Sequence, residues 1–307
     1  MSEHVIGVGV ATVWAEPDAP RDVDAPAVAD QPDAAAFATL SDDDRRGLHG
    51  LILTQALLGE PVRIVDERGD WCQVVLPWQP HGQDEGYPGW VRRAHVLPDA
   101  TAAATEAVVA TEAVVVTALI AQCIPDTGAA MDLSYGTMLP LVAGGADHAV
   151  VTLPDGRTAR LPSTRVRRTG GSVNADALVS SARQFLGLRY LWGGLSGWGL
   201  DCSGLVHLVH RAHGIGVPRD AGDQLDAGRR ISLDAAAPGG LYFFARPGQR
   251  AYHVGFVTST PERRSGGELT MLHAPEGAPG DGGLVEDAPL APHRFDTLVA
   301  SAGFLPV

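Results

Sequence analysis

A cysteine that could act as a nucleophile stands in the segment Asp201-Cys202-Ser203-Gly204-Leu205-Val206. Apolar residues recur from Leu205 at helical spacing, and Gly214 stands where a helix commonly ends, so the cysteine is expected to open a helix. Asp201 is a favoured N-cap residue, and its carboxylate can accept a backbone N–H of the first turn. The free N–H groups and the dipole at a helix start stabilise a thiolate and an oxyanion. The spacing alone fits a small buried cysteine equally well, so a catalytic role depends on other residues.

Two histidines could complete a catalytic group with this cysteine. A cysteine nucleophile needs a base and a third group that orients the base. His253 begins the apolar run 253–258, and His273 lies late in the run 269–274. If these runs form neighbouring antiparallel strands, the imidazoles come side by side, with His253 as the base for Cys202 and His273 holding its far nitrogen. A lone histidine on a strand is more commonly structural, so the prediction rests on all three residues together.

The other histidines do not predict a metal site. His207, His210 and His213 are three residues apart on the predicted helix, so they drift across its face, and no Glu or Cys completes a ligand set. Six more stand outside these motifs and are expected at the surface: His4, His49, His81, His95, His148 and His293. Neither a metal nor another cofactor is expected.

Composition excludes several classes of protein. The 307 residues carry a net charge of -13 and no run of Lys or Arg, which argues against a nucleic-acid partner. Three cysteines without CxxC spacing indicate neither a disulfide framework nor a zinc site and fit a reducing compartment. Residues 1–14 show no secretion signal, and no apolar window is long enough to span a membrane. A cytoplasmic monomer without a membrane partner is therefore expected.

The first half of the chain contains an approximate repeat. Short runs at 59–65 and 73–77 are echoed by runs at 136–142 and 150–154, which indicates two copies of one β module. The stretch from Pro17 to about Asp44 is rich in Asp, Ala and Pro with little periodicity, and it is expected to be a solvated loop insertion. Residues 99–113 repeat Thr-Glu-Ala-Val-Val and are expected to form a linker.

Three short motifs mark the first β module: the turn at Gly59-Glu60-Pro61-Val62, Gly69-Asp70-Trp71 and Gly89-Trp90-Val91. With these motifs the module resembles bacterial SH3-like (SH3b) domains. The second copy lacks the tryptophans, so its assignment rests on spacing and position.

Five motifs stand in order between about residue 172 and the C-terminus: Tyr190-Leu191-Trp192-Gly193-Gly194, Asp201 to Val206, Val217-Pro218-Arg219-Asp220 with Gln224, His253-Val254-Gly255, and Leu272-His273-Ala274-Pro275. Together they resemble the ordered motifs of the NlpC/P60 cysteine peptidases. The resemblance implies a papain-like fold with a triad of Cys202, His253 and His273. It also implies that the Tyr190 hydroxyl assists at the oxyanion, although Tyr190 could equally be a packed aromatic residue.

The whole chain is thus expected to be an α+β protein, a papain-like NlpC/P60 catalytic domain preceded by two small SH3-like β-barrels. The expected divisions are a first SH3b domain at 1–98 with the loop insertion at about 17–44, the linker at 99–113, a second SH3b domain at 114–170 and the catalytic domain at 171–307.

Two positions depart from the family pattern. Many relatives carry Gly-Asp where this chain has Gly239-Gly240, and a hydroxyl residue where it has Ala221. The second change weakens one expected contact to a substrate.

The domain order resembles that of gamma-D-glutamyl-L-diamino acid endopeptidases that recycle cell-wall peptides. The resemblance implies peptidoglycan-derived peptides, L-Ala-gamma-D-Glu followed by diaminopimelate or lysine, as substrates. Substrate contacts are expected from Glu60 and Tyr87, which would recognise the free amine, and from Asp201, Ser203, Asp220 and Trp192. Glu60 could instead be a solvated turn residue and Tyr87 a packing residue, while Asp201 could serve mainly as the helix cap.

Two other functions remain open from the sequence. The chain could be a wall-peptide binding protein with an inactive cysteine domain, or an acyltransferase that passes its thioester to an acceptor other than water. The three triad residues favour a working hydrolase.

Overall fold

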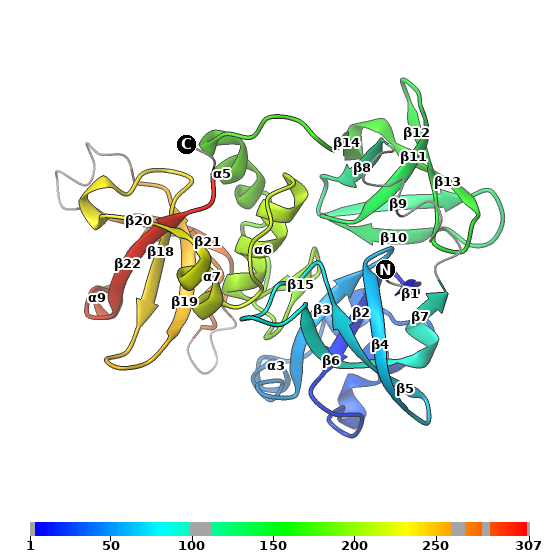
Figure 1. Cartoon of the computed structure of the whole chain (residues 1–307), viewed down its shortest axis with the longest axis horizontal. Coiled ribbons are helices and arrows are strands. Elements are labelled where there is room, and N and C mark those ends of the chain that lie inside the picture. The colour runs from blue at the N-terminus through cyan, green and yellow to red at the C-terminus, as the bar shows by residue number, and fades with distance from the viewer. Residues whose placement is uncertain (1–3, 99–111, 260–267, 278–282, 306–307) are drawn as a thin grey trace.

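The computed structural model describes residues 4–98, 112–259, 268–277 and 283–305. These residues form two seven-stranded antiparallel sheets, followed by helices and a six-stranded antiparallel sheet (Figure 1). We call the parts the first β-module (4–98), the second β-module (112–168) and the C-terminal domain (172–305). Most of the predicted linker at 99–113 lies outside the described residues.

The first β-module is built from short amphipathic strands in the order β3-β2-β6-β5-β4-β1-β7. Its elements are β1 (His4–Ile6), β2 (Val10–Trp14), β3 (Ile52–Leu57), β4 (Pro61–Arg68), β5 (Trp71–Leu76), β6 (Tyr87–Arg92), the 3-10 turn η2 (Arg93–His95) and β7 (Val96–Pro98). Side chains alternate between the core and the surface along each strand. In β5, Cys72, Val74 and Leu76 are fully buried, and the residues between them are half-buried.

The segment 17–44, predicted to be a solvated loop, instead forms short helices, and that prediction is wrong. They are η1 (Asp22–Asp24), α1 (Ala25–Val28), α2 (Ala34–Phe37) and α3 (Asp42–Arg46). The reason is twofold. Phe37 is buried in an apolar cluster with Trp14 and with Leu191 of the C-terminal domain, and acidic residues act as caps, as when Asp33 accepts the backbone N–H of Ala36.

The second β-module repeats this topology strand for strand, in the order β10-β9-β13-β12-β11-β8-β14. Its elements are β8 (Ala113–Val116), β9 (Ile120–Pro125), β10 (Met131–Ser134), β11 (Met138–Gly144), β12 (His148–Thr152), β13 (Thr158–Pro162), η3 (Ser163–Arg165) and β14 (Val166–Arg168). The predicted repeat of one module is confirmed. Gly136, at φ +83°, lets this module approach the C-terminal domain, because a Cβ there would stand 2.4 Å from Leu208 Cδ1.

The C-terminal domain packs helices against a sheet of order β17-β22-β18-β19-β20-β21. Its elements are α5 (Ala175–Arg183), β15 (Leu195–Ser196), β16 (Gly199–Leu200), α6 (Cys202–Ala212), α7 (Ala221–Ala227), β17 (Arg229–Ile231), η4 (Leu233–Ala235), β18 (Leu241–Ala245), β19 (Ala251–Val257), β20 (Thr270–His273), β21 (Glu286–Pro289), α9 (Pro292–Phe295) and β22 (Leu298–Gly303). The two neighbouring strands predicted at 253–258 and 269–274 are confirmed as β19 and β20.

Helix α6 lies between the sheet of the C-terminal domain and the two β-modules (Figure 1). Every one of its residues is buried, although two are histidines and one is arginine. A helix buried on all sides needs a partner for each polar group, so its surroundings fix its position closely. Within the described ranges, no helix combines the length and apolarity needed to cross a membrane.

Candidate active site

Cys202 opens α6, as the capping pattern predicted. Asp201 has an extended backbone and accepts the N–H of Gly204 at 2.6 Å through its side chain. Helix α6 ends at Ala212, and Gly214 follows in the left-handed region at φ +75°. The thiol therefore stands at the start of a helix that Asp201 caps.

The charge state of the Cys202 thiol differs from the thiolate that the helix start suggested. Burial and the neighbouring Asp201 carboxylate raise the pKa of Cys202 to about 12. Backbone N–H groups of Val254 and Ser203 lower this pKa, but they do not outweigh burial. The resting group is a neutral thiol, so its proton has to leave as it attacks.

His253 and His273 lie side by side, as the strand pattern predicted. Strands β19 and β20 pair antiparallel, and His253 Nε2 is 2.9 Å from His273 Nδ1. Burial, and then the charge of Arg294, hold the pKa of His253 well below its ordinary value, and the same causes lower that of His273 to about 3. Both rings are therefore neutral, and a neutral imidazole is the form that can accept a proton from a thiol.

Glu286, which was not among the predicted site residues, lies behind this pair. It is directly opposite His273 across β20 and β21, with its Oε1 3.2 Å from His273 Nε2. A carboxylate there favours a proton on His273 Nε2, which leaves Nδ1 to accept from His253 Nε2. The remaining nitrogen of His253, Nδ1, is then free to act as a base. Only the register of β21 reveals Glu286, and no motif marks it.

Cys202 opens into a cavity of about 380 Å³ formed by the first β-module and the C-terminal domain. We call this cavity the groove. The first β-module contributes His49, Gly50, Ile52, Leu53 and Tyr87. Of the predicted site residues, all line the groove except Glu60, His253 and His273. The two histidines are buried behind Cys202 in the sheet, so one wall of the groove carries the reactive group and the other comes from the first β-module.

Tyr87 and Asp220 meet across the groove. The Tyr87 hydroxyl donates to Asp220 Oδ2 at 3.0 Å. Burial raises the pKa of the Asp220 carboxyl, while Arg219 and the hydrogen bond from Tyr87 lower it. A hydroxyl of the first β-module thus holds a carboxylate of the C-terminal domain in place beside the groove.

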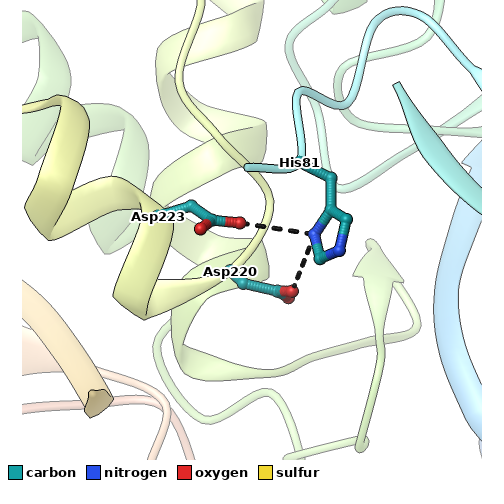
Figure 2. A group of neighbouring side chains, drawn as sticks. All are labelled: His81, Asp220 and Asp223. Atoms are coloured by element: carbon teal, nitrogen blue, oxygen red, sulfur yellow. Dashed lines mark ion pairs between the residues drawn. The ribbon is translucent and has the colours of Figure 1, made fainter. Parts of the chain in front are cut away.

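His81 contacts the same region and is not the isolated surface residue that the sequence suggested. Its Nδ1 lies 3.4 Å from Asp220 and 3.3 Å from Asp223 (Figure 2). Within the described part of the chain these three are the one group with metal-ligand geometry. Asp223 already accepts the N–H of Gly82 and a bond from Arg250, so the cluster is a polar contact between the two domains.

Tyr190 and Trp192 line the groove beside Cys202. Burial raises the pKa of Tyr190 well above its ordinary value, so its hydroxyl keeps its proton and can donate a hydrogen bond. The Tyr190 carbonyl accepts from Arg45 of α3 at 2.6 Å. Trp192 donates to the Ile52 carbonyl at 3.2 Å, and its ring lies 4.0 Å from that of His49. Helix α3 thus contacts Tyr190, and strand β3 contacts Trp192.

Glu60 does not face the groove, and its prediction as a substrate contact is wrong. The side chain is buried, and its carboxylate accepts from the Leu57 N–H, from Gln79 Nε2 and from Arg211. The turn between β3 and β4 directs Glu60 toward α6. Its carboxylate is therefore fully engaged inside the protein.

Asp201 is paired with Arg219, for which no separate role was predicted. Arg219 Nη2 lies 2.7 Å from Asp201 Oδ2, and Arg219 Nη1 donates to Asp201 Oδ1 and to Ser203 Oγ. The Arg219 side chain is 1% exposed and that of Asp201 12%. A charge on Asp201 would otherwise oppose ionisation of Cys202, so this buried pair limits that opposition.

Comparison with known proteins agrees with this geometry. The NlpC/P60 family matches residues 187–280, and the bacterial dipeptidyl-peptidase Sh3 domain matches residues 45–96. The chain is similar to the gamma-D-glutamyl-L-lysine dipeptidyl-peptidase of Bacillus subtilis (strain 168), with 34% identity over 89% of this chain and 90% of that protein. The protein of the same name from Bacillus cereus (strain ATCC 10987 / NRS 248) is 31% identical over 89% and 83%.

A solved structure shows the same arrangement. A crystal structure of an NlpC/P60 family protein from Bacillus cereus ATCC 10987 superimposes with a TM-score of 0.89, covering 99% of this chain and 100% of the other at 30% identity. The likeness extends over both β-modules and the cysteine domain. The chain therefore belongs to the NlpC/P60 family of cysteine peptidases.

Proposed function

We propose that the protein is a cysteine endopeptidase that hydrolyses the gamma-D-glutamyl-L-diamino acid bond of peptidoglycan-derived peptides beginning with a free L-Ala. The observation that carries this proposal is a single groove that holds Cys202 on one domain and Tyr87 on the other. The names of the two Bacillus relatives support the choice of bond.

The site residues fit the chemistry of acyl transfer to water. The Cys202 thiol attacks the gamma-glutamyl carbonyl as His253 Nδ1 takes its proton, and a thioester forms. The backbone N–H of Cys202 and the Tyr190 hydroxyl stabilise the oxyanion. His253 then protonates the departing amine, accepts a proton from water, and returns it to the thiolate when the thioester is hydrolysed.

The amine end of the substrate is assigned to Tyr87 and Asp220. An ammonium group donates to carboxylates and hydroxyls. Asp201 is paired with Arg219, whereas Asp220 faces the groove and is held by the Tyr87 hydroxyl. Asp220 therefore replaces Glu60 as the carboxylate that recognises a free N-terminus. Ser203 and Trp192 line the rest of the peptide path.

The free amine should decide the rate of cleavage. We expect the wild type to cleave L-Ala-gamma-D-Glu-L-Lys about 10- to 100-fold faster than its N-acetylated form, because a charged hydrogen bond contributes about 1.5–3 kcal/mol. Asp220→Asn should reduce this ratio toward one, measured as kcat/KM for each peptide by chromatography. Asp226→Asn, on the exposed end of α7, is the matched control and should keep the wild-type ratio. Equal rates for both peptides in the wild type would remove the amine assignment.

Activity should persist into mildly acidic solution. His253 works as a neutral base, and burial holds its pKa well below 6.5, so protonation removes the base only as the pH falls through that lower value. We expect kcat/KM to stay level from pH 8 to pH 6.5 and to decline only in more acidic solution, in a pH profile recorded with a single peptide. A half-maximal rate at pH 6.5 or above would contradict a buried neutral base.

Product analysis tests the reaction itself. Peptides with lysine and with diaminopimelate at the third position should each release L-Ala-gamma-D-Glu, and their relative kcat/KM values give the preferred diamino acid. With glycinamide as a competing amine, hydrolysis predicts free dipeptide, while a dominant dipeptide-glycinamide product would identify an acyltransferase. No release of dipeptide from either peptide would favour a binding protein.

An intracellular location is part of the proposal. The three cysteines are all unpaired, which fits a reducing compartment. The domain division at 1–98, 114–170 and 171–307 is proposed likewise and is supported by the two matching sheets. The monomeric state and the absence of a cofactor stay predictions.

A further inference from the structure

A chain of buried polar side chains connects the first β-module to both ends of helix α6. It contains Thr54, Gln79 and Glu60 of the first β-module and Arg211 and Arg219 of the C-terminal domain. We call it the interdomain network. None of the five residues is more than 7% exposed, and none of them lines the groove. The network therefore lies behind the substrate site and does not form its wall.

The Thr54 hydroxyl accepts a hydrogen bond from one domain and donates one within the other. Arg219 Nε donates to Thr54 Oγ1 at 2.8 Å, and the Thr54 hydroxyl donates to Gln79 Oε1 at 2.7 Å, the nearer of its two acceptors. Thr54 thus uses its hydroxyl both as an acceptor and as a donor. No apolar side chain of the same shape can do either, so the link from Arg219 to Gln79 depends on this one oxygen.

The other half of the network continues from Gln79 to the far end of α6. Gln79 Nε2 donates to Glu60 Oε1 at 2.7 Å and to the Gln55 carbonyl at 2.8 Å. Glu60 Oε2 accepts from Arg211 Nη1 at 2.9 Å. Arg211 belongs to the last turn of α6, while Arg219 binds Asp201, the N-cap of the same helix. The first β-module thus reaches both ends of the helix that carries Cys202.

We propose that Thr54 and Gln79 are positioning residues for the reaction, because they hold the Arg219 and Asp201 pair, and with it Cys202, in the attacking position. The first β-module then has a second task beside forming the groove wall. The proposal rests on Cys202 being the nucleophile, and not on the identity of the peptide.

Thr54→Val and Thr54→Ser separate this role from simple packing. Valine keeps the shape and loses the hydroxyl, whereas serine keeps the hydroxyl. We expect Thr54→Val to lower kcat about 10-fold with KM within about twofold of the wild type, because a misplaced reacting group costs rate and not binding. Thr54→Ser should restore kcat to within about twofold. Alkylation of Cys202 by iodoacetamide, followed by mass spectrometry of its peptide, should slow in Thr54→Val and recover in Thr54→Ser.

A second pair of variants guards against a folding defect in Thr54→Val. Gln79→Met removes both amide functions at similar length and should give the same fall in kcat and in alkylation. Gln73→Met, on the half-buried face of β5, is the control and should match the wild type. Wild-type kcat and alkylation in folded Thr54→Val or Gln79→Met would overturn the proposal. If the wild type cleaves neither peptide, the proposed function fails, and alkylation still decides the role of the network.

Discussion

Cys202→Ala is expected to lower kcat/KM for L-Ala-gamma-D-Glu-L-Lys by about 10⁴-fold or more, because removing the nucleophile of a triad abolishes most of its rate enhancement. The fold should be unaffected, since Cys202 is a small residue at a helix start whose cap, Asp201, stays in place. The measurement is release of L-Ala-gamma-D-Glu by chromatography with purified protein, alongside a circular dichroism spectrum.

Cys123→Ala is the matched control. Cys123 is also buried, and burial also raises the pKa of its thiol, to about 11, but it lies in β9 of the second β-module. This variant should keep wild-type activity with a small loss of stability. Equal turnover by the wild type and Cys202→Ala would remove the cysteine mechanism, and with it the proposed function.

Arg219→Met is expected to lower the free energy of unfolding by about 3–5 kcal/mol, the usual cost of breaking a buried ion pair by removing one partner. The substitution leaves the Asp201 carboxylate buried without its counter-charge and removes a donor from Thr54 and from Ser203. The pKa of Cys202 should rise further, because Arg219 is one of the groups that lowers it. Urea denaturation of both proteins measures the loss of stability.

Arg63→Met is the control for the same chemistry at the surface. Arg63 pairs with Glu85 at 2.8 Å, close to the 2.7 Å of the buried pair, but both partners are exposed. Its loss should cost less than about 1 kcal/mol. If the two variants lose similar stability, burial is not what makes the Arg219 and Asp201 pair important.

The parts of the site that the sequence predicted are those set by local chemistry. Asp201 is a cap because of its position before an apolar helix, and Cys202 follows from that. His253 and His273 could be paired because consecutive strands commonly lie side by side. The cap follows from one short stretch of chain and the histidine pair from two consecutive strands, so neither prediction needed contacts between distant domains.

The parts that could not be predicted depend on contacts between distant segments. Glu60 is in a turn, and nothing near it indicates that the turn faces Arg211 in another domain. Phe37 gave no periodic signal because the helices around it are only one turn long. Glu286 became visible only through its register with His273. The thiolate prediction for Cys202 considered the helix start and omitted burial, which decides the pKa.

The contacts of the first β-module with α6 bear on how such chains can be rearranged. A module that only formed one wall of the groove could be exchanged for another of the same fold. The first β-module also supplies partners to two buried cations, Arg211 and Arg219. Exchange without Thr54, Gln79 and Glu60 would leave Arg211 buried without its counter-charge and would remove one hydrogen-bond acceptor from Arg219. The three side chains therefore have to be kept together with helix α6 in any domain exchange. The first β-module and the C-terminal domain are thus expected to evolve as one unit.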